Sequence, residues 1–425
     1  MPATPLTSHP SSSPTSADLE ATYASLSSRG ITPVAGLGIE VHHSSLRGVK
    51  KANEDRIAMQ ECDLGVLIVV FDGHLSDELS DHAAKVLPQQ LCERIASNVE
   101  QSPSDLSAAV EEALTKGIED FDASLIDAVY KLFPDGAATD WSDEYWEDPF
   151  HVYERIGRSK EDERFRSVRR AVVGTTALVA FVDKDSKYVW VASLGDSEAG
   201  LGRVDDEGMH FIALNKLHNS DNPAEVARLQ IEHPNEPPVV YEGRTLDWLA
   251  VTRALGDFQA KVPLDLGMRV LDCAFPSYLL DETVDAWKSR GHVHPPYISS
   301  KPTVQRHTLL PGDRLVLASD GLRNSLTRQR VEEDDIPSFI AAPAAAGLDA
   351  GASVQNLSGR LGHEFLPAED GENMADLVIR NALFGTNENK RAEELSLAED
   401  DSADRYRDDI SVVVVNLQGA KQLLA

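Results

Sequence analysis

The residues best suited to chemistry are acidic side chains that stand beside apolar segments. They are Asp72 after GVLIVVF, Asp196 after KYVWVASLG, Asp320 after RLVLAS, Asp408 and Asp409 before ISVVVVNL, and the pair Glu54 and Asp55 before residues 57–59. Each alone could be a turn residue, because aspartate is common in turns. Five acidic sites beside core segments are harder to explain in this way. Carboxylates brought together repel one another unless a cation neutralises them.

A cluster of carboxylates with no cysteine and histidine ligand set indicates a hard divalent cation. Oxygen ligands favour Mg²⁺ or Mn²⁺, whereas a structural zinc site would need cysteine or histidine. Two such ions about 3.5–4 Å apart can share a hydroxide and lower its pKa towards neutrality. That hydroxide could attack a phosphorus atom in line with its leaving group. The residue types therefore suggest metal-dependent phosphoryl chemistry.

The segments that must position these residues alternate between apolar strands and amphipathic helices. Residues 65–71 are β-branched and apolar, which predicts a strand buried on both faces. Ser76 is expected to cap a helix that Pro88 kinks or divides. A second helix with one apolar stripe is expected from about residue 104. Residues 174–204 predict a β-meander, and two later strands are expected at 314–319 and 410–417. The predicted class is α+β, with sheets covered by helices.

Composition limits the partners and the compartment. The 425 residues are 42% hydrophobic and carry a formal net charge of −30. This acidity argues against nucleic acid and anionic membrane surfaces as partners, because both attract clustered lysine and arginine. The three cysteines, Cys62, Cys92 and Cys273, provide no disulfide framework by their spacing, which indicates a reducing intracellular setting. No apolar run is long enough to span a bilayer, and no secretory signal is evident.

The chain is expected to form one domain behind a short tail. Residues 1–28 are rich in Ser, Thr and Pro and predict a mobile tail, and residues 29–425 predict the folded domain. An acidic, aromatic segment near 134–168, expected to be a long loop, and a mainly helical and loop-like segment near 337–400 are interpreted as insertions. The tail has acidic residues before its first arginine, so it is a poor transit peptide and the composition favours the cytoplasm. We expect a monomer.

Seven short motifs give the chain a family resemblance. They are NEDR, VFDGH, GTTALV, GDSEA, VTRALGD, LASDGL and RDDISVVVV, between about residues 36 and 417. In this order and spacing they resemble the metal-dependent protein phosphatases of the 2C type. HNSDNPAEVARLQIEHP and PPYISSKP resemble the pyruvate dehydrogenase phosphatase branch, which would point to mitochondria. The resemblance implies a two-sheet antiparallel β-sandwich flanked by helices. It also implies a phosphoprotein serine/threonine phosphatase with a phosphorylated protein as substrate.

The resemblance also assigns roles to individual residues. Asp72 would bridge two Mg²⁺ or Mn²⁺ ions, one of them bound by the Gly73 carbonyl, and Asp320 and Asp408 would hold the other. Glu54 and Asp55 would act through water or from behind the ligands, and Asp196 with Asp320 would form a weaker third site. Asp409 would replace Asp408 only if the strand register shifted by one.

His74 would protonate the leaving alkoxide; the alternative is a turn histidine that caps the next helix. Thr252, Arg253, Gly256 and Asp257 are expected to set the fold around the cleft.

Three departures from the family pattern bear on these roles. Lys50 stands where many members carry a phosphate-binding arginine, and lysine cannot form the bidentate fork. The nearby cations Lys50, Lys51 and Arg56 are therefore all candidates for the substrate phosphate, with Lys50 and Arg56 preferred. Asn324 stands where an aspartate is frequent, beside Arg323 where an aromatic residue is usual, which weakens the case for a third metal. Glu198 replaces the usual arginine after the motif GDS.

Two other functions compete with this one. A pseudophosphatase that serves as a binding scaffold would explain Lys50 and Asn324, but it has no need to hold Asp72, Asp320 and Asp408 together. Metal binding distinguishes the two, because the scaffold has no use for Mg²⁺ or Mn²⁺. A phosphatase with a covalent phosphoaspartate needs a second aspartate two residues after the nucleophile. Residue 74 is histidine instead, so this alternative ranks lowest.

Overall fold

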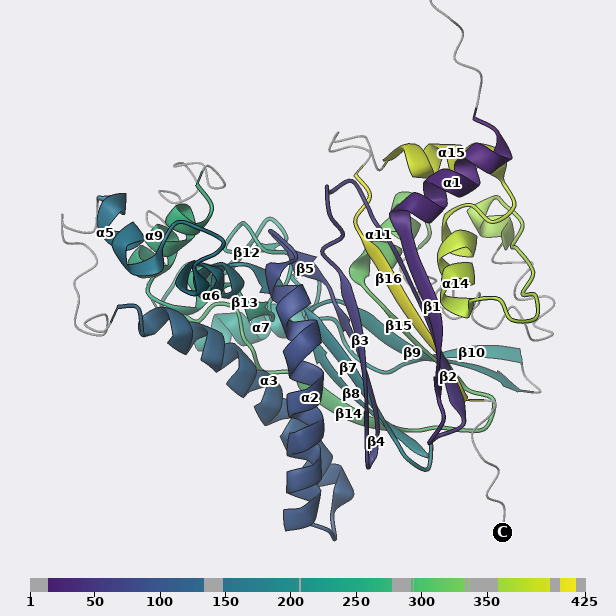
Figure 1. Ribbon diagram of the computed structural model, residues 1–425, viewed down its shortest axis with the longest axis horizontal. Coiled ribbons are helices and arrows are strands. Elements are labelled where there is room, and N and C mark those ends of the chain that lie inside the picture. Colours follow the sequence, from purple (N-terminus) through teal and green to yellow (C-terminus); the bar gives the residue numbers. More distant parts are fainter. Residues whose placement is uncertain are drawn as a thin grey trace, which may run out of the picture.

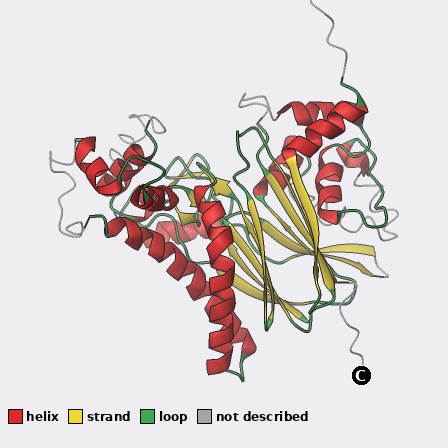
Figure 2. Cartoon of the chain, viewed as in Figure 1, coloured by secondary structure: helices red, strands yellow, loops and turns green. Residues whose placement is uncertain are grey.

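Two antiparallel β-sheets pack against each other at the centre of the structure, and helices cover their outer faces (Figures 1 and 2). The computed structural model describes residues 14–133, 148–205, 208–276, 292, 294–332, 336, 358–397 and 406–417. This arrangement confirms the predicted α+β class and the two-sheet sandwich. Among the described residues, no helix combines the length and the apolar character needed to cross a bilayer.

The first sheet contains strands from both the N-terminal and the C-terminal parts of the chain. Its six strands follow the order β1-β2-β16-β15-β9-β10, and every neighbouring pair is antiparallel. The bounds are β1 Ser27–Val34, β2 Ile39–Leu46, β9 Glu198–Asp205, β10 Gly208–Ala213, β15 Arg314–Ala318 and β16 Ile410–Asn416. The predicted strands at 314–319 and 410–417 are thus neighbours at the centre of this sheet.

The second sheet contains the predicted meander and the most apolar strand. Its order is β14-β8-β7-β4-β3, again antiparallel throughout. The bounds are β3 Arg56–Cys62, β4 Gly65–Phe71, β7 Ala177–Asp183, β8 Tyr188–Leu194 and β14 Thr303–Thr308. Every residue of β4 is buried, as predicted. Alternate residues serve two cores, because Val66, Ile68 and Val70 face the other sheet while Leu67, Val69 and Phe71 face the helices.

Helices cover the sandwich in two layers. On the five-stranded sheet lie α2 Glu78–Gln101 and α3 Leu106–Tyr130, and this layer is extended by α6 Glu163–Val172, α9 Leu264–Ala274 and α5 Pro149–Ile156, which pack against these helices and one another. On the six-stranded sheet lie α1 Ser16–Leu26, α11 Asp320–Arg328, α14 Met374–Leu383 and α15 Glu388–Ser396. In Figure 1 the two layers flank the strands on opposite sides. The sandwich core, the third apolar cluster, lies between the sheets.

A smaller unit projects beside the sheets. It contains α7 Pro223–Glu232, the hairpin β11 Val240–Tyr241 and β12 Arg244–Thr245, and the short helix α8 Phe258–Lys261. A three-stranded sheet of β5 Gly73–His74, β6 Gly174–Thr175 and β13 Leu255–Gly256 connects this unit to the end of β4. We call residues 219–251 the hairpin segment. It has its own apolar cluster around Leu229, Leu246 and Tyr297.

The helix at residues 78–101 differs from its prediction. α2 continues through Pro88 without a break, because the proline ring is buried and the flanking Leu87 and Leu91 fix the helix on the sheet. Burial therefore offsets the hydrogen bond that proline removes. The helix cap is Asp77, one residue after the expected Ser76, whose hydroxyl oxygen instead accepts a hydrogen bond from the backbone N–H of Glu78 at 3.3 Å.

The expected tail and the segment near 134–168 contain more structure than the composition predicts, whereas the helices within 337–400 are expected. Residues 16–26 form α1, whose buried Tyr23 donates a hydrogen bond to Asp376 at 2.8 Å, so the predicted tail of residues 1–28 is too long. Ordinary packing of two apolar residues, Leu19 and Tyr23, is enough to fix this short helix. Helix α5 lies within the 134–168 segment, and α14 and α15 lie within 337–400. Residues 134–147 and 337–357 lie outside the described residues.

Candidate metal centre and cleft

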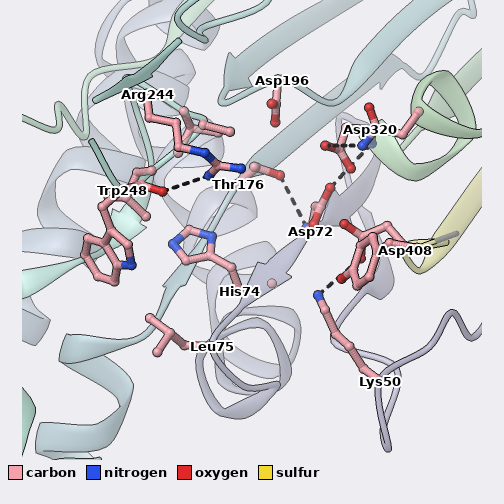
Figure 3. Close-up of a pocket in the computed structure, with 16 residues that line it drawn as sticks. Lys50, Asp72, His74, Leu75, Thr176, Asp196, Arg244, Trp248, Asp320 and Asp408 are labelled. Atoms are coloured by element: carbon pink, nitrogen blue, oxygen red, sulfur yellow. Dashed lines mark hydrogen bonds and ion pairs between the residues drawn. The ribbon is translucent and has the colours of Figure 1, made fainter. Parts of the chain in front are cut away.

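A cleft of about 500 Å³ opens at the end of the sandwich where β4 leads into β5. Carboxylates line one side of it and the hairpin segment lines the other (Figure 3). The cleft is lined by residues that include Lys50, Asp72, Gly73, His74, Asp196, Arg244, Trp248, Asp320, Asn324, Tyr406 and Asp408. Most of the predicted site residues therefore meet in one place.

Strand topology explains why the aspartates converge. Asp320 follows β15 and Asp408 precedes β16, which are adjacent antiparallel strands, so both residues fall at the same sheet end. Asp196 precedes β9 on the other side of β15. Asp72 follows β4 in the opposite sheet and completes the group across the sandwich. An alternating antiparallel arrangement thus collects residues that lie far apart in the sequence.

The tightest group is formed by Asp72, Asp196 and Asp320. Each offers a carboxylate oxygen, and these oxygens all lie within 4.8 Å of one another. Burial raises the pKa of Asp72 and Asp196 well above the usual range, and the charge of Asp320 adds to the effect. Burial, followed by the charge of Asp408, raises the pKa of Asp320 to about 6. The group is therefore under mutual repulsion that a cation would relieve.

The donor set fits a hard divalent cation. The three aspartates of this group offer carboxylate oxygens, and a fourth aspartate, Asp408, lines the same cleft. Asn324 lies beside them, and its amide donates a hydrogen bond to Asp320 Oδ2 at 2.9 Å. An aspartate at position 324 would add another negative charge to the cluster. The amide of Asn324 instead orients the Asp320 side chain.

Lys50 supplies a positive charge at one edge of the cluster. Its ammonium nitrogen lies 2.6 Å from Glu54 Oε2 and 3.2 Å from Asp408 Oδ1. Burial by itself lowers the pKa of Lys50, but the charges of Asp408 and Glu54 outweigh it and raise the pKa above its ordinary value. Lys50 therefore stays charged and is held by carboxylates in this structure.

The remaining acidic residues lie behind the cleft. Asp409 accepts hydrogen bonds from the backbone N–H groups of Gly48 and Glu54, both at 2.7 Å, so it fixes the loop that carries Lys50. Asp55 is buried and accepts a hydrogen bond from the Ser319 hydroxyl at 2.7 Å. Neither residue lines the cleft, and the strand register places Asp408 there instead of Asp409.

Gly73 is required by a close backbone contact. A Cβ atom added at this position would lie 2.6 Å from the backbone oxygen of Glu54, which is closer than atoms approach in real proteins. The Ser80 hydroxyl donates a hydrogen bond to the same oxygen at 2.5 Å. The turn after β4 is therefore packed against the loop before β3, which keeps Asp72 and His74 at the mouth of the cleft.

His74 is held by a fully buried carboxylate. Its Nε2 lies 2.9 Å and 3.0 Å from the two carboxylate oxygens of Asp257, which is 0% exposed. Burial by itself lowers the pKa of His74, but the charge of Asp257 outweighs it and raises the pKa above the usual value. Asp257 was expected only to shape the fold, and the sequence gives no signal that it contacts His74.

Arg244 is a cleft residue that no sequence motif marks. It lies on β12, is exposed, and donates a hydrogen bond to the backbone oxygen of Trp248 at 2.8 Å. Figure 3 shows its guanidinium group between His74 and Asp196. Arg56, which was expected to contact phosphate, does not line the cleft and instead pairs with Asp77 at 2.5 Å and Asp81 at 3.4 Å.

Arg323 and Glu198, which both depart from the family pattern, contact each other in the structure. Arg323 on α11 forms an ion pair with Glu198 on β9, and both side chains are largely buried. β9 pairs with β15, which leads directly into α11, so the two residues are neighbours across this junction. The carboxylate of Glu198 is thus neutralised close to Asp196 and Asp320.

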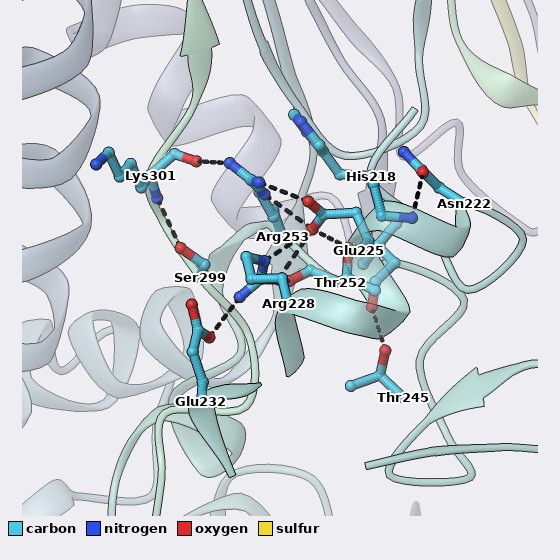
Figure 4. Close-up of polar contacts among 12 residues, drawn as sticks. His218, Asn222, Glu225, Arg228, Glu232, Thr245, Thr252, Arg253, Ser299 and Lys301 are labelled. Atoms are coloured by element: carbon cyan, nitrogen blue, oxygen red, sulfur yellow. Dashed lines mark hydrogen bonds and ion pairs between the residues drawn. The ribbon is translucent and has the colours of Figure 1, made fainter. Parts of the chain in front are cut away.

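A buried ionic network fixes the hairpin segment (Figure 4). Glu225 on α7 accepts hydrogen bonds from Arg253 at 2.5 Å and 2.9 Å, from Arg228 at 2.9 Å and from the Thr252 hydroxyl at 2.8 Å. Arg253 also donates to the backbone oxygen of Lys301 at 2.9 Å. Burial raises the pKa of Glu225, but these donors outweigh it and lower the pKa to about 2. The expected structural role of Thr252 and Arg253 agrees with these contacts.

Replacing Glu225 with glutamine is expected to destabilise the fold by about 1.5–3 kcal/mol, because the buried carboxylate loses its charge-assisted hydrogen bonds from two partly buried arginines, Arg253 and Arg228. The contribution of Glu225 is present above its unfolded pKa and is lost as pH falls towards its folded pKa of about 2. Denaturant unfolding of wild type, Glu225→Gln and Glu232→Gln measures this. Glu232 lies on the same helix but is about half exposed, and equal losses in the two variants would contradict the account.

The fold and the cleft together define a helix-flanked β-sandwich that collects carboxylates at one end. The family model described as protein phosphatase 2C matches residues 39–333, which is more than half of the chain. The chain therefore belongs to the protein phosphatase 2C family, whose members are generally dependent on Mg²⁺ or Mn²⁺.

Several curated proteins are similar to this chain. "[Pyruvate dehydrogenase [acetyl-transferring]]-phosphatase 1, mitochondrial" of Bos taurus is 33% identical over 61% of this chain and 51% of its own length. The protein of the same name from Saccharomyces cerevisiae is 26% identical over 81% of this chain and 60% of its own length. The chain thus spans about half the length of the mammalian relatives it matches. These matches confirm the resemblance to the pyruvate dehydrogenase phosphatase branch.

Solved structures agree on the fold. A crystal structure of a phosphatase from a pathogenic strain of Toxoplasma gondii has a TM-score of 0.50 at 16% identity, and the match covers 92% of this chain and 95% of that one. At this identity the likeness concerns the fold alone. It confirms the predicted sandwich.

Proposed function

We propose that this chain is a metal-dependent phosphatase that hydrolyses phosphoserine and phosphothreonine in proteins. The observation that carries the proposal is the group of Asp72, Asp196 and Asp320, whose carboxylate oxygens lie within 4.8 Å of one another in a cleft of the family fold. A scaffold protein gains nothing from holding like charges together, because their repulsion destabilises the folded state. A phosphatase gains a cation site.

The carboxylates would hold two Mg²⁺ or Mn²⁺ ions. Asp72 and the Gly73 carbonyl would contact the first, and Asp72, Asp320 and Asp408 the second, while Asp196 with Asp320 would offer a weaker third position. When bound, such ions supply Lewis acidity that lowers the pKa of water and neutralises phosphoryl charge. Glu54 and Asp55 lie behind these ligands and would act through water bound to the metal. Asn324 in place of a carboxylate reduces the charge available to a third ion.

His74 would act as the general acid. A serine or threonine alkoxide is a poor leaving group, so its oxygen must receive a proton as the bond to phosphorus breaks. The carboxylate of Asp257 holds His74 Nε2 at 2.9 Å and favours the protonated imidazole. Asp257 is therefore proposed as the residue that orients His74 and keeps it charged.

Two cations would contact the substrate phosphate. Arg244 faces the cleft from the hairpin segment and offers a planar fork that suits phosphate oxygens. Lys50 lies on the opposite side and is engaged by Glu54 and Asp408. We assign the direct contact to Arg244 and a supporting electrostatic contribution to Lys50. Arg56 is not part of the proposal, since it is turned towards Asp77 and Asp81.

Release of phosphate from a phosphoserine peptide tests this function. We expect hydrolysis with Mn²⁺ or Mg²⁺, and none after chelation of the metal. Phosphorylated pyruvate dehydrogenase, after which the similar phosphatases are named, provides a second assay beside an unrelated phosphopeptide. Absence of metal-dependent hydrolysis on every substrate would leave the scaffold function as the better account.

Replacing Arg244 with alanine is expected to raise KM for a phosphopeptide by roughly 10- to 100-fold with a smaller change in kcat, because a charge-assisted hydrogen bond contributes about 1.5–3 kcal/mol. Steady-state kinetics at saturating Mn²⁺ measures this. Arg306→Ala is the matched control, since Arg306 is exposed on β14 and does not line the cleft. An unchanged KM in Arg244→Ala would remove Arg244 from the proposed site.

A further inference from the structure

Two of the three cysteines lie in contact far from the cleft. Cys62 is the last residue of β3, and Cys92 lies in α2, the helix that packs across this strand. Each thiol is the largest influence on the pKa of the other, so the two side chains lie within reach of each other. Cys92 Sγ also lies 3.9 Å from the backbone oxygen of Gln60, two residues before Cys62. This distance and the packing of α2 on β3 place the Cys92 thiol over the end of β3.

The pairing depends on the fold. Thirty residues of sequence separate the two cysteines, and only the packing of α2 on β3 brings them together. Both belong to the apolar cluster between the five-stranded sheet and its helices, where Leu91 and Ile95 flank Cys92. Cys273 lies on α9 and interacts with Tyr153 instead, so it provides an internal comparison within the same chain.

The two thiols differ in exposure and in acidity. Cys62 is partly exposed, whereas Cys92 is buried. The hydrogen bond from Cys92, the largest influence, lowers the pKa of Cys62 to about 7, while the same bond raises the pKa of Cys92 far above its usual value. Burial raises the pKa of Cys273 to about 12. Thiolate is the nucleophilic form, so the accessible member of the pair is also the reactive one.

We propose that Cys62 and Cys92 are a reversible oxidation site that takes a hydroperoxide and forms an intramolecular disulfide. The Cys62 thiolate attacks one peroxide oxygen, the O–O bond breaks, and the leaving oxygen takes a proton and departs as water or alcohol. The resulting sulfenic acid is attacked by the Cys92 sulfur, which loses its proton. The S–S bond forms and the sulfenic oxygen leaves as water. Two thiols are oxidised and one peroxide is reduced.

The position of the pair predicts what the cross-link does. β3 runs for seven residues from Arg56 to Cys62, so the pair lies about 20 Å from the loop that carries Glu54 and Asp55. Along α2, Cys92 is also about 20 Å from the helix start near His74. The cross-link therefore ties helix to sheet without touching the cleft. We expect a melting midpoint higher by on the order of 5 °C and catalytic activity changed by less than about twofold.

Mass spectrometry of the full chain tests the proposal. The reduced protein is treated with a small excess of hydrogen peroxide, alkylated and digested without reductant. We expect a linked peptide pair containing Cys62 and Cys92, alkylated Cys273, and recovery of both free thiols after dithiothreitol. Cys273→Ser is expected to form the same link. Cys92→Ser is expected to stop at sulfenic acid on Cys62, which dimedone captures.

Two results would overturn the inference. One is a wild-type protein in which Cys62 is oxidised but no link to Cys92 forms. The other is a linked protein whose melting midpoint is unchanged or whose activity falls severalfold, because the pair would then not act as a tether remote from the cleft. The wild-type measurement does not depend on any variant folding. It is also independent of the proposed phosphatase function, since the mass readout requires no activity.

Discussion

Replacing Asp72 with asparagine is expected to lower Mn²⁺-dependent hydrolysis of a phosphoserine peptide by about a thousandfold. Asp72 stands at the end of β4 and shares the tightest carboxylate group with Asp196 and Asp320. Residues that merely support a metal ligand cost about 10–100-fold when they are changed, so a residue proposed to bridge two ions should cost more. The amide keeps the shape of the side chain and removes its charge, so the fold should persist.

The matched control is Asp63→Asn. Asp63 is an exposed residue in the turn between β3 and β4, at the opposite end of the same strand. Steady-state rates are compared at saturating Mn²⁺, with circular dichroism to verify folding. Activity within about tenfold of wild type in Asp72→Asn would contradict the assignment of Asp72 as the bridging ligand.

Replacing His74 with glutamine should produce the second large effect, and its size should depend on the substrate. General acid catalysis contributes about 10²–10⁴-fold, so the rate on a phosphoserine peptide should fall by this order. An aryl phosphate has a leaving group that needs little protonation, and its hydrolysis should fall much less. This difference separates a proton donor from a residue that only shapes the cleft.

Asp257→Asn should reproduce part of the His74 effect. The amide removes the charge that favours the imidazolium and one acceptor of its N–H, yet leaves His74 in place. We expect a smaller loss on the peptide, again with little loss on the aryl phosphate. Equal losses on both substrates in the two variants would show that His74 and Asp257 act by another means than proton donation.

The strands and the acidic residues could be predicted because their signals are local. A short apolar, β-branched segment such as residues 65–71 favours a strand buried on both faces. The polar residue that follows it then lies at the end of that strand. Asp72, Asp320 and Asp408 were therefore placed correctly at strand ends around one cleft. Two departures concern burial: Pro88 remains within α2, and α1 is packed although its sequence resembles a tail.

The partners of these residues could not be predicted, because they come from distant segments. Asp257 contacts His74 across 183 residues, and Glu198 pairs with Arg323 across 125 residues. Arg244 reaches the cleft only because the hairpin segment folds over it. No periodicity or turn signal marks such residues, since their positions follow from the packing of sheets and helices. Arg56 is the opposite case. It belongs to the motif NEDR in the sequence, but its side chain pairs with Asp77 and does not line the cleft.

Calorimetric titration of Mn²⁺ into the wild-type chain tests the central claim most directly. The claim is that the carboxylates of Asp72, Asp196, Asp320 and Asp408 form a divalent cation site. We predict saturable binding of at least two ions, with heat that is strongly reduced in Asp72→Asn and unchanged in Asp63→Asn. Absence of Mn²⁺ and Mg²⁺ binding in the folded wild-type protein would contradict the claim and leave this member of the family as a binding scaffold.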